Sequence, residues 1–168
     1  TVSREGVRSA IDNLLAGNFN TDERTLLHLT SDPKLFEDFP FALNDLTIMK
    51  KDSSSMITVH VFVDRELLNS YWADGVIVAT PNGSTGYSLS CGGPLIYPHS
   101  DSLVITPVSP HNLAARPIVI SEDSEISFQI EGRSKKFLVS LDSRYETVSA
   151  NVKLTVKKEK FKINLILL

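Results

Sequence analysis

Apolar and polar residues alternate one by one along the last third of the chain. The alternation covers residues 126–130, 137–141, 152–156 and 163–167. A period of two places one face of a strand in a core and the other in solvent, which is typical of antiparallel sheets. Upstream, short apolar or β-branched runs predict further strands, over residues 24–30, 41–49, 57–63, 67–71, 75–80, 103–108 and 117–120.

Helical spacing is found at the start of the chain. Apolar residues recur at the i, i+3, i+4 and i+7 positions between Val7 and Leu15, with Ser3 placed to cap the helix and Gly17 to end it. A second, short helix is expected around residues 85–91. The predicted strands are joined by only a few residues, which leaves no room for repeated crossover helices. We therefore expect a mostly β fold, a multi-stranded β-sandwich with an N-terminal helix and few short helices.

Composition narrows the classes of function. The 168 residues suffice for one sizeable domain, and 42% apolar with 22% charged residues is ordinary for a globular protein. The net charge of −3 provides no basic surface, so no nucleic-acid partner is expected. Cys91 is the single cysteine, which excludes an intrachain disulfide and fits a reducing compartment. No run is apolar over the roughly 18 residues of a membrane span, so we expect a cytoplasmic protein without a membrane partner.

The stretch TPNGSTGYS, residues 80–88, stands out by its hydroxyls and glycines. Asn82 and Gly83 both tolerate a positive φ, so a hairpin turn is one interpretation. The hydroxyl side chains between residues 84 and 90 exceed what a turn needs, and a second glycine pair follows at residues 92–93. These features favour a loop whose N–H groups and hydroxyls hold a phosphate or a sugar. The loop has neither the lysine of a Walker motif nor the spacing of a nucleophile elbow.

Acidic residues beside apolar runs are the other candidates for a binding site. Asp74 precedes a strongly apolar strand, although a turn aspartate before Gly75 is the plainer interpretation. Asn44-Asp45 interrupts an apolar run where strand alternation would not place two polar residues. An ionised carboxylate only accepts hydrogen bonds, so it suits ribose hydroxyls or an exocyclic amine. Asp142-Ser143-Arg144 by itself predicts a surface turn, and the four histidines show no metal-binding spacing.

Taken together, these segments resemble the NAD kinase family, in the family's order. The resemblance rests on ALND at residues 42–45, ADG at 73–75, TPNGSTGYSLS at 80–90, GGP at 92–94, SPH at 109–111, ARP at 115–117 and LDS at 141–143. It implies phosphorylation of the 2′-hydroxyl of the adenosine ribose of NAD. The phosphate donor would be ATP or polyphosphate, with a divalent metal for which Mg²⁺ is the first candidate. It also implies a homo-oligomer, a dimer or tetramer.

The resemblance further implies a division of labour between two domains. Family members have an N-terminal α/β domain, whose Gly-Gly-Asp-Gly motif supplies the general base. That motif is absent from this chain, so we assign it no catalytic residue, no metal ligand and no tightly bound cofactor, and expect it to be inactive alone. Residues 1–20 would form a helical junction to the N-terminal domain. Residues 21–168 would form the NAD-binding and oligomerisation sandwich.

The family's NAD-binding positions carry over residue by residue. Asn44 and Asp45 would hold the adenosine, Asp74 would accept from an amino group, and Arg144 would reach a phosphate or the 2′ position. In the loop, Tyr87 would offer an aromatic face and Ser90 a hydroxyl. The full NAD-binding set is Asn44, Asp45, Ser55, Trp72, Asp74, Thr85, Gly86, Tyr87, Ser88, Leu89, Ser90 and Arg144, with loop backbone from Asn82, Gly83 and Ser84.

Three of these positions depart from the family pattern. Asn82 stands where threonine or serine is usual, Gly86 where alanine is usual, and Arg144 where glutamine is common.

Two other functions fit the same residues. One is a nucleotide-sensing β-sandwich without catalysis, and the other is a related lipid kinase domain. A lipid headgroup site should adjoin an apolar groove for the tails, which the polar loop at residues 80–90 does not favour. A Gly-Gly-Asp-Gly motif encoded upstream of Thr1 would separate the NAD kinase from the sensor.

Overall fold

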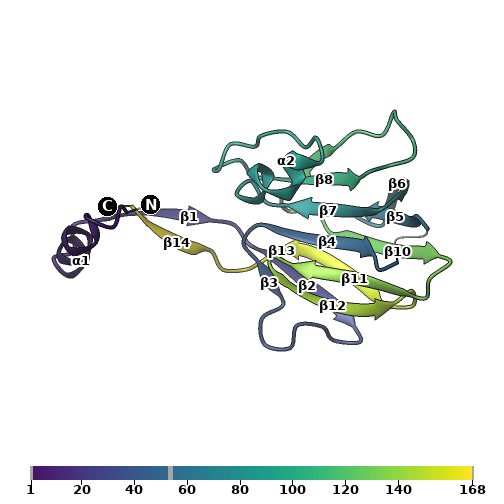
Figure 1. Ribbon diagram of the computed structural model, residues 1–168, viewed down its shortest axis with the longest axis horizontal. Coiled ribbons are helices and arrows are strands. Elements are labelled where there is room, and N and C mark those ends of the chain that lie inside the picture. Colours follow the sequence, from purple (N-terminus) through teal and green to yellow (C-terminus); the bar gives the residue numbers. More distant parts are fainter. Residues whose placement is uncertain (1, 53–54, 168) are drawn as a thin grey trace.

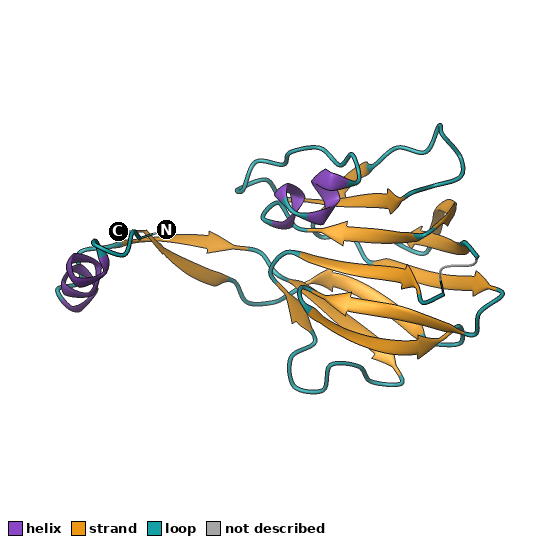
Figure 2. Ribbon diagram, in the orientation of Figure 1, coloured by secondary structure: helices purple, strands orange, loops and turns teal. Residues whose placement is uncertain are grey.

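Two antiparallel sheets of six strands each form a sandwich, in the computed structural model that describes residues 2–52 and 55–167 (Figures 1 and 2). The first sheet contains, in spatial order, β3 (Phe41–Ala42), β2 (Leu27–Asp32), β13 (Lys153–Lys158), β10 (Ile126–Gly132), β5 (Ile57–Val63) and β6 (Glu66–Ala73). The second contains β12 (Arg144–Ser149), β11 (Lys136–Leu141), β4 (Asp45–Lys50), β7 (Gly75–Ala79), β8 (Ser102–Val108) and β9 (Ile118–Ser121). The expected mostly β sandwich is confirmed.

One core lies between the two sheets, and alternate residues of each strand fill it. Leu46 and Ile48 of β4 are buried against Val59 and Val61 of β5 and their neighbours in a single apolar cluster. Burying a side chain of this size stabilises the fold by about 1.5–3 kcal/mol. The period-two pattern in the sequence is therefore the pattern that builds the core.

Strand β7 is buried on both faces, which explains its unbroken apolar run. Val76 and Val78 point into the core between the sheets. Ile77 and Ala79 join a second cluster on the outer face, which packs against Cys91 and Ile96. The cover is made by the 3₁₀ helix η1 (Gly83–Thr85), the short helix α2 (Tyr87–Ser90) and the chain that follows them. The short helix expected near residues 85–91 is α2. Because η1 and α2 form this cover, the loop at residues 80–90 lies against the outer face of the second sheet.

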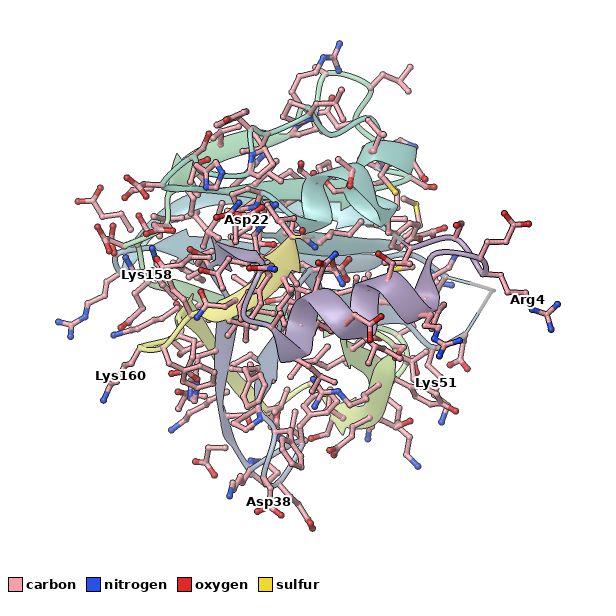
Figure 3. The ribbon with its side chains drawn as sticks, turned by 90° about the vertical axis from the view of Figure 1, so that its left-hand side faces the viewer. Arg4, Asp22, Asp38, Lys51, Lys158 and Lys160 are labelled. Atoms are coloured by element: carbon pink, nitrogen blue, oxygen red, sulfur yellow. The ribbon has the colours of Figure 1, made fainter. Side chains whose placement is uncertain are left out.

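An arm extends from the sandwich (Figure 1). It comprises helix α1 (Val7–Leu15) and a ribbon in which β1 (Asn20–Arg24) pairs with β14 (Ile163–Leu167). The alternation at residues 163–167 predicted a strand correctly, but this strand belongs to the ribbon and to neither large sheet. Figure 3 looks along the arm, with α1 in front and Asp22 of β1 beside β14. The predicted boundary between a junction at 1–20 and a sandwich at 21–168 stays a prediction.

Details of the helix and strands differ from expectation. Ser3 does not cap α1: its hydroxyl accepts the N–H of Gly6 at 3.2 Å in the preceding turn, and the helix begins at Val7 without a side-chain cap. Gly17 does end the helix, with φ +73°. The run at 41–49 is two strands, β3 and β4, because Leu43 and Asn44 leave the ladder between them. Strand β12 was not predicted, since its residues are mostly polar.

Among the residues that the structure describes, neither α-helix could cross a bilayer, because the longer one has nine residues.

Candidate functional site

The Asn44–Asp45 turn and the loop at residues 80–90 are held against each other. Asp45 pairs with Ala79 in the β4–β7 ladder, so the chain entering β4 lies beside the chain leaving β7. The N–H of Thr80 donates to the Asn44 carbonyl at 2.9 Å. The Thr80 hydroxyl donates to the Leu43 carbonyl at 2.6 Å. The sheet thus brings together two motifs that are separated by about 35 residues in the sequence.

Side chains strengthen this junction. The Asn82 amide donates to the Asn44 side-chain oxygen at 2.7 Å, and the N–H of Gly83 donates to the Thr80 hydroxyl at 3.1 Å. A Cβ on Gly83 would lie 2.1 Å from the Asn44 carbonyl oxygen. Gly83 is therefore needed for close packing between the two motifs, in addition to any approach to a ligand.

Two buried serine hydroxyls of the loop also have partners inside the protein. The buried Ser84 hydroxyl donates to the Pro81 carbonyl at 2.7 Å and accepts the N–H of Ile96 at 3.0 Å. The buried Ser88 hydroxyl pairs with Thr106 of β8 at 2.8 Å. Both serines fasten the loop to the sheet, and their predicted contact with NAD stays a prediction.

The rest of the loop faces outward. The exposed residues are Thr85, Gly86, Tyr87, Leu89 and Ser90. Tyr87 and Leu89 are each 42% exposed. This surface alternates an aromatic ring, an aliphatic side chain and hydroxyls. It offers a stacking surface beside hydrogen-bonding groups, which is the combination that a nucleoside needs.

Asp45 has the most perturbed carboxyl group of the site. Burial, and secondarily the nearby charge of Asp142, raise the pKa of Asp45 from 3.8 to about 6. Burial and the adjacent Cys91 raise the pKa of Tyr87, with smaller effects from the carboxylates of Asp74 and Asp45. The site is thus acidic around Tyr87, which suits hydroxyl and amine donors better than phosphate.

Asp74 has a partner that the sequence did not reveal. It lies at the bend between β6 and β7, where its N–H donates to the Val108 carbonyl at 2.9 Å. Its carboxylate forms an ion pair with Lys50 Nζ at 2.6 Å, and the side chains are 30% and 21% exposed respectively. The pairing compensates the cost of placing this carboxylate beside an apolar strand.

Ser55 and Trp72 lie together in a pocket of their own. They line a hollow of about 300 Å³ with Met56 and Arg133. The Trp72 ring is half exposed and packs on His111, with ring centroids 4.3 Å apart.

Arg144 is engaged within the fold. Its guanidinium donates to the Phe39 carbonyl at 2.6 Å and to the Phe41 carbonyl, and it lies 5.8 Å from the centroid of the Phe36 ring. Its predicted contact with a phosphate or the 2′ position stays a prediction, and it would require some of these bonds to be released.

Asp142 was interpreted as part of a surface turn and proves central to the site. Its carboxylate accepts the backbone N–H groups of Leu43, Asn44 and Asp45 at 2.9, 2.8 and 3.2 Å. Its backbone has φ +51°, a conformation that Asp tolerates better than most residues. The local sequence signal, an Asp following an apolar run, is shared by surface turns, and the LDS motif at residues 141–143 entered only as part of the family resemblance.

No three His, Cys, Asp or Glu side chains come together as metal ligands in the described part of the chain.

Comparison with known proteins gives the family. The family model for the ATP-NAD kinase C-terminal domain matches residues 43–168. This chain belongs to the NAD kinase family. It is 57% identical to an NAD kinase of Cytophaga hutchinsonii over 99% of the chain, and 44% identical to one of Bacteroides fragilis over 98%. It spans 57% of the length of each of these relatives.

Solved structures of NAD kinase relatives share the fold. A yeast NADH kinase complexed with NADH has a TM-score of 0.86 at 26% identity, over 98% of this chain and 49% of that one. An NAD kinase from Archaeoglobus fulgidus in complex with ATP has a TM-score of 0.81 at 24% identity, over 97% of this chain and 61% of that one. The resemblance found in the sequence is confirmed as that to an NAD kinase C-terminal domain.

Proposed function

We propose that this chain is the NAD-binding domain of an NAD kinase, which phosphorylates the 2′-hydroxyl of the adenosine ribose of NAD. Family membership supports the reaction, and one structural observation supports the location of the site. The Asn44–Asp45 turn is hydrogen-bonded to the start of the 80–90 loop, and the loop exposes Tyr87, whose raised pKa includes small effects of the Asp74 and Asp45 charges.

In this proposal, Asp45 accepts from ribose hydroxyls and Asn44 assists with the adenosine. Asp74 accepts from an amino group of adenine or of the nicotinamide carboxamide, while Tyr87 stacks on the dinucleotide. The exposed Thr85, Gly86, Leu89 and Ser90 line the same ligand. The dinucleotide phosphates would be placed away from Asp45 and Asp74, because like charges repel.

The remaining machinery is proposed for the longer protein. An N-terminal α/β domain would supply the general base, an aspartate in a Gly-Gly-Asp-Gly motif, and residues 1–20 would join it to the sandwich. ATP or polyphosphate would supply the phosphoryl group with Mg²⁺ held outside this chain. We also propose that the protein is cytoplasmic and forms a dimer or tetramer.

Calorimetric titration with NAD tests the site. Asp74→Asn keeps the shape of the side chain but removes its charge, so NAD should bind about tenfold or more weakly, equivalent to about 1.4 kcal/mol. The variant also leaves Lys50 without its anion. Glu125→Gln is a matched control, because it likewise removes a carboxylate from a lysine, Lys157, with which it pairs at 2.5 Å. The control should bind NAD as the parent does.

The outcome depends on which form of the protein binds. Binding by the 168-residue chain, weakened by Asp74→Asn alone, would support a dinucleotide site on this domain. Binding only by the full-length protein would mean that the N-terminal domain completes the site. A folded full-length protein that binds no NAD would refute the proposal.

A further inference from the structure

Three side chains at alternate positions after β11 hold the segment that leads into the candidate site. Asp142 accepts three N–H groups of residues 43–45, as described above. Arg144 donates to the carbonyls of Phe39 and Phe41. Glu146 accepts the N–H of Phe36 at 2.6 Å. Residues 36–45 run antiparallel to residues 142–146. The two carboxylates, Asp142 and Glu146, therefore accept from backbone N–H groups near the two ends of the segment, and the Arg144 guanidinium donates to carbonyls between them.

This arrangement replaces an ordinary strand ladder. Strand β12 is the edge strand of its sheet, and β3 belongs to the other sheet, so the segment 36–44 lies outside the backbone ladder of β12. On the side that faces β12, its backbone N–H and C=O groups receive partners from side chains instead. The residues that these side-chain hydrogen bonds join are 97–110 positions apart in the sequence.

Asp142 acts on the part of the segment that carries the candidate ligand contacts. Two of its acceptor bonds go to the amides of Asn44 and Asp45 themselves. The N–H of Asp142 donates in return to the Asp45 carbonyl at 2.9 Å. The turn is therefore bound on both sides and fixed before any ligand arrives.

We propose that Asp142, with Arg144 and Glu146 behind it, is a positioning residue that presets the Asn44–Asp45 turn for the nucleoside of NAD. This inference rests on the proposed function. The energetic basis is that a turn already ordered does not lose conformational entropy when the ligand binds. Neither Asp142 nor Glu146 needs to touch the ligand for this role.

The charge of Asp142 gives the proposal a signature that a purely structural role lacks. The charge that acts on the Asp45 carboxyl is that of Asp142 from the β11–β12 turn, and Asp45 in turn contributes weakly to the raised pKa of Tyr87 from α2. The charge of Asp142 disfavours the ionised form of Asp45. At the same time, the Asp142 carboxylate orders the backbone of Asp45 by accepting its N–H. Removing the charge should therefore weaken binding and, at the same time, lower the pH at which Asp45 ionises.

The test uses the full-length protein with Asp142→Asn. Asn tolerates the positive φ of this position, so backbone strain is not added, while one acceptor oxygen is replaced by a donor. Asp64→Asn is a matched control: Asp64 also has φ +51°, and its carboxylate accepts the N–H of Glu125 at 2.9 Å in another turn. Arg144→Gln serves as a second variant that loosens the segment without changing the charge beside Asp45.

Two measurements are made on each variant. Hydrogen–deuterium exchange of the peptide covering residues 41–47 reports order in the turn, and calorimetry between pH 5 and 8 reports NAD affinity. In Asp142→Asn, exchange should be at least about tenfold faster, the Kd for NAD should rise about tenfold at pH 8, and the pH midpoint of binding should fall. Arg144→Gln should speed exchange with an unchanged midpoint, and Asp64→Asn should change neither.

Each contrary result has a distinct meaning. Exchange at residues 41–47 that is unaffected by Asp142→Asn would overturn the positioning role. Faster exchange with parental NAD affinity and midpoint would overturn the link from the turn to binding, although NAD binding by this domain would stand. A full-length parent that binds no NAD would overturn the proposed function and this inference with it.

Discussion

At the scale of single residues, Asp45 combines a favourable position with an unfavourable charge. Its carboxyl group lies at the start of β4, partly buried, and feels the negative charge of Asp142, whose carboxylate accepts the Asp45 backbone N–H. Both effects favour the protonated form and raise the pKa to about 6. A hydrogen-bond donor brought by a ligand would relieve this situation, because it stabilises the ionised form. Strain of this kind is common where a side chain is poised for binding.

The raised pKa predicts how NAD binding depends on pH. Above about pH 7, Asp45 is ionised and accepts from ribose hydroxyls; below its pKa of about 6 it carries a proton, and one acceptor is lost. We expect affinity to be constant above pH 7 and to fall as the pH drops through 6, by up to tenfold per unit. Calorimetry between pH 5 and 8 measures this.

Asp45→Asn is the control for that titration. The variant has no group that ionises here, so its NAD affinity should be lower at pH 8 and nearly level between pH 5 and 8. A fall of the same size in the variant would assign the effect to another group, such as one of the four histidines.

Two glycines of the loop should differ strongly in their response to alanine. At Gly83, a Cβ would lie 2.1 Å from the carbonyl oxygen of Asn44 and 2.5 Å from its carbon, so the backbone must move. At Gly86, whose φ is −95°, the nearest atom would be 3.3 Å away. Gly83→Ala should lower the free energy of unfolding by about 2–3 kcal/mol, and Gly86→Ala by less than about 1 kcal/mol, because one carbonyl oxygen need move by only a few tenths of an ångström.

Urea unfolding of both variants measures the difference, and NAD titration shows whether Gly83→Ala also displaces Asn44. Equal stability of the two variants would mean that the loop and the turn are not packed together as described.

At the scale of elements, the sequence predicted the helices and strands whose signal lies in a local pattern of apolar and polar residues. Alternation identified the core strands, and the apolar run of β7 was interpreted as a buried strand, which the cover of α2 explains. The partners of side chains far apart in sequence could not be predicted. Asp142 accepts the N–H of Asn44 across 98 residues of sequence, and Asp74 lies beside Lys50 because the antiparallel pairing of β4 with β7 continues past Met49 and Gly75. β12 was missed because its bonds to the 36–44 segment require polar side chains, which weaken the strand pattern.

Arg144 gives a prediction about the segment before the site. With Arg144→Gln, the carbonyls of Phe39 and Phe41 lose their guanidinium donors, so this segment should open more often. Lys34 is exposed at its start and offers a trypsin site. We expect cleavage after Lys34 to become several-fold faster than in the parent, measured by mass spectrometry. An unchanged rate, with Asp64→Asn as the control, would show that Arg144 does not hold the segment.

At the scale of the whole molecule, the arm is fastened at its base and unsupported further out. Thr25 donates to the buried Glu122 at 3.0 Å, and Lys158 bonds the other oxygen of that carboxylate at 2.7 Å. Beyond this point, α1 buries none of its side chains, although its apolar residues line one face. An apolar face of this kind needs a partner, since exposing it in water is costly. The proposed N-terminal domain is the natural candidate, because the curated relatives are longer than this chain.

Ile11 of α1 tests that assignment, because its side chain is 50% exposed in this chain. If α1 packs on the N-terminal domain, Ile11→Glu should leave the free energy of unfolding of the 168-residue chain within about 0.5 kcal/mol of the parent value. In the full-length protein the same change should cost about 2–4 kcal/mol, because a charge then replaces a buried side chain. Ser9→Glu, which is also exposed but on the opposite face of the helix, controls for charge alone and should be mild in both forms. Equal, small effects of Ile11→Glu in both forms would mean that α1 stays in solvent and that the junction between the domains lies elsewhere.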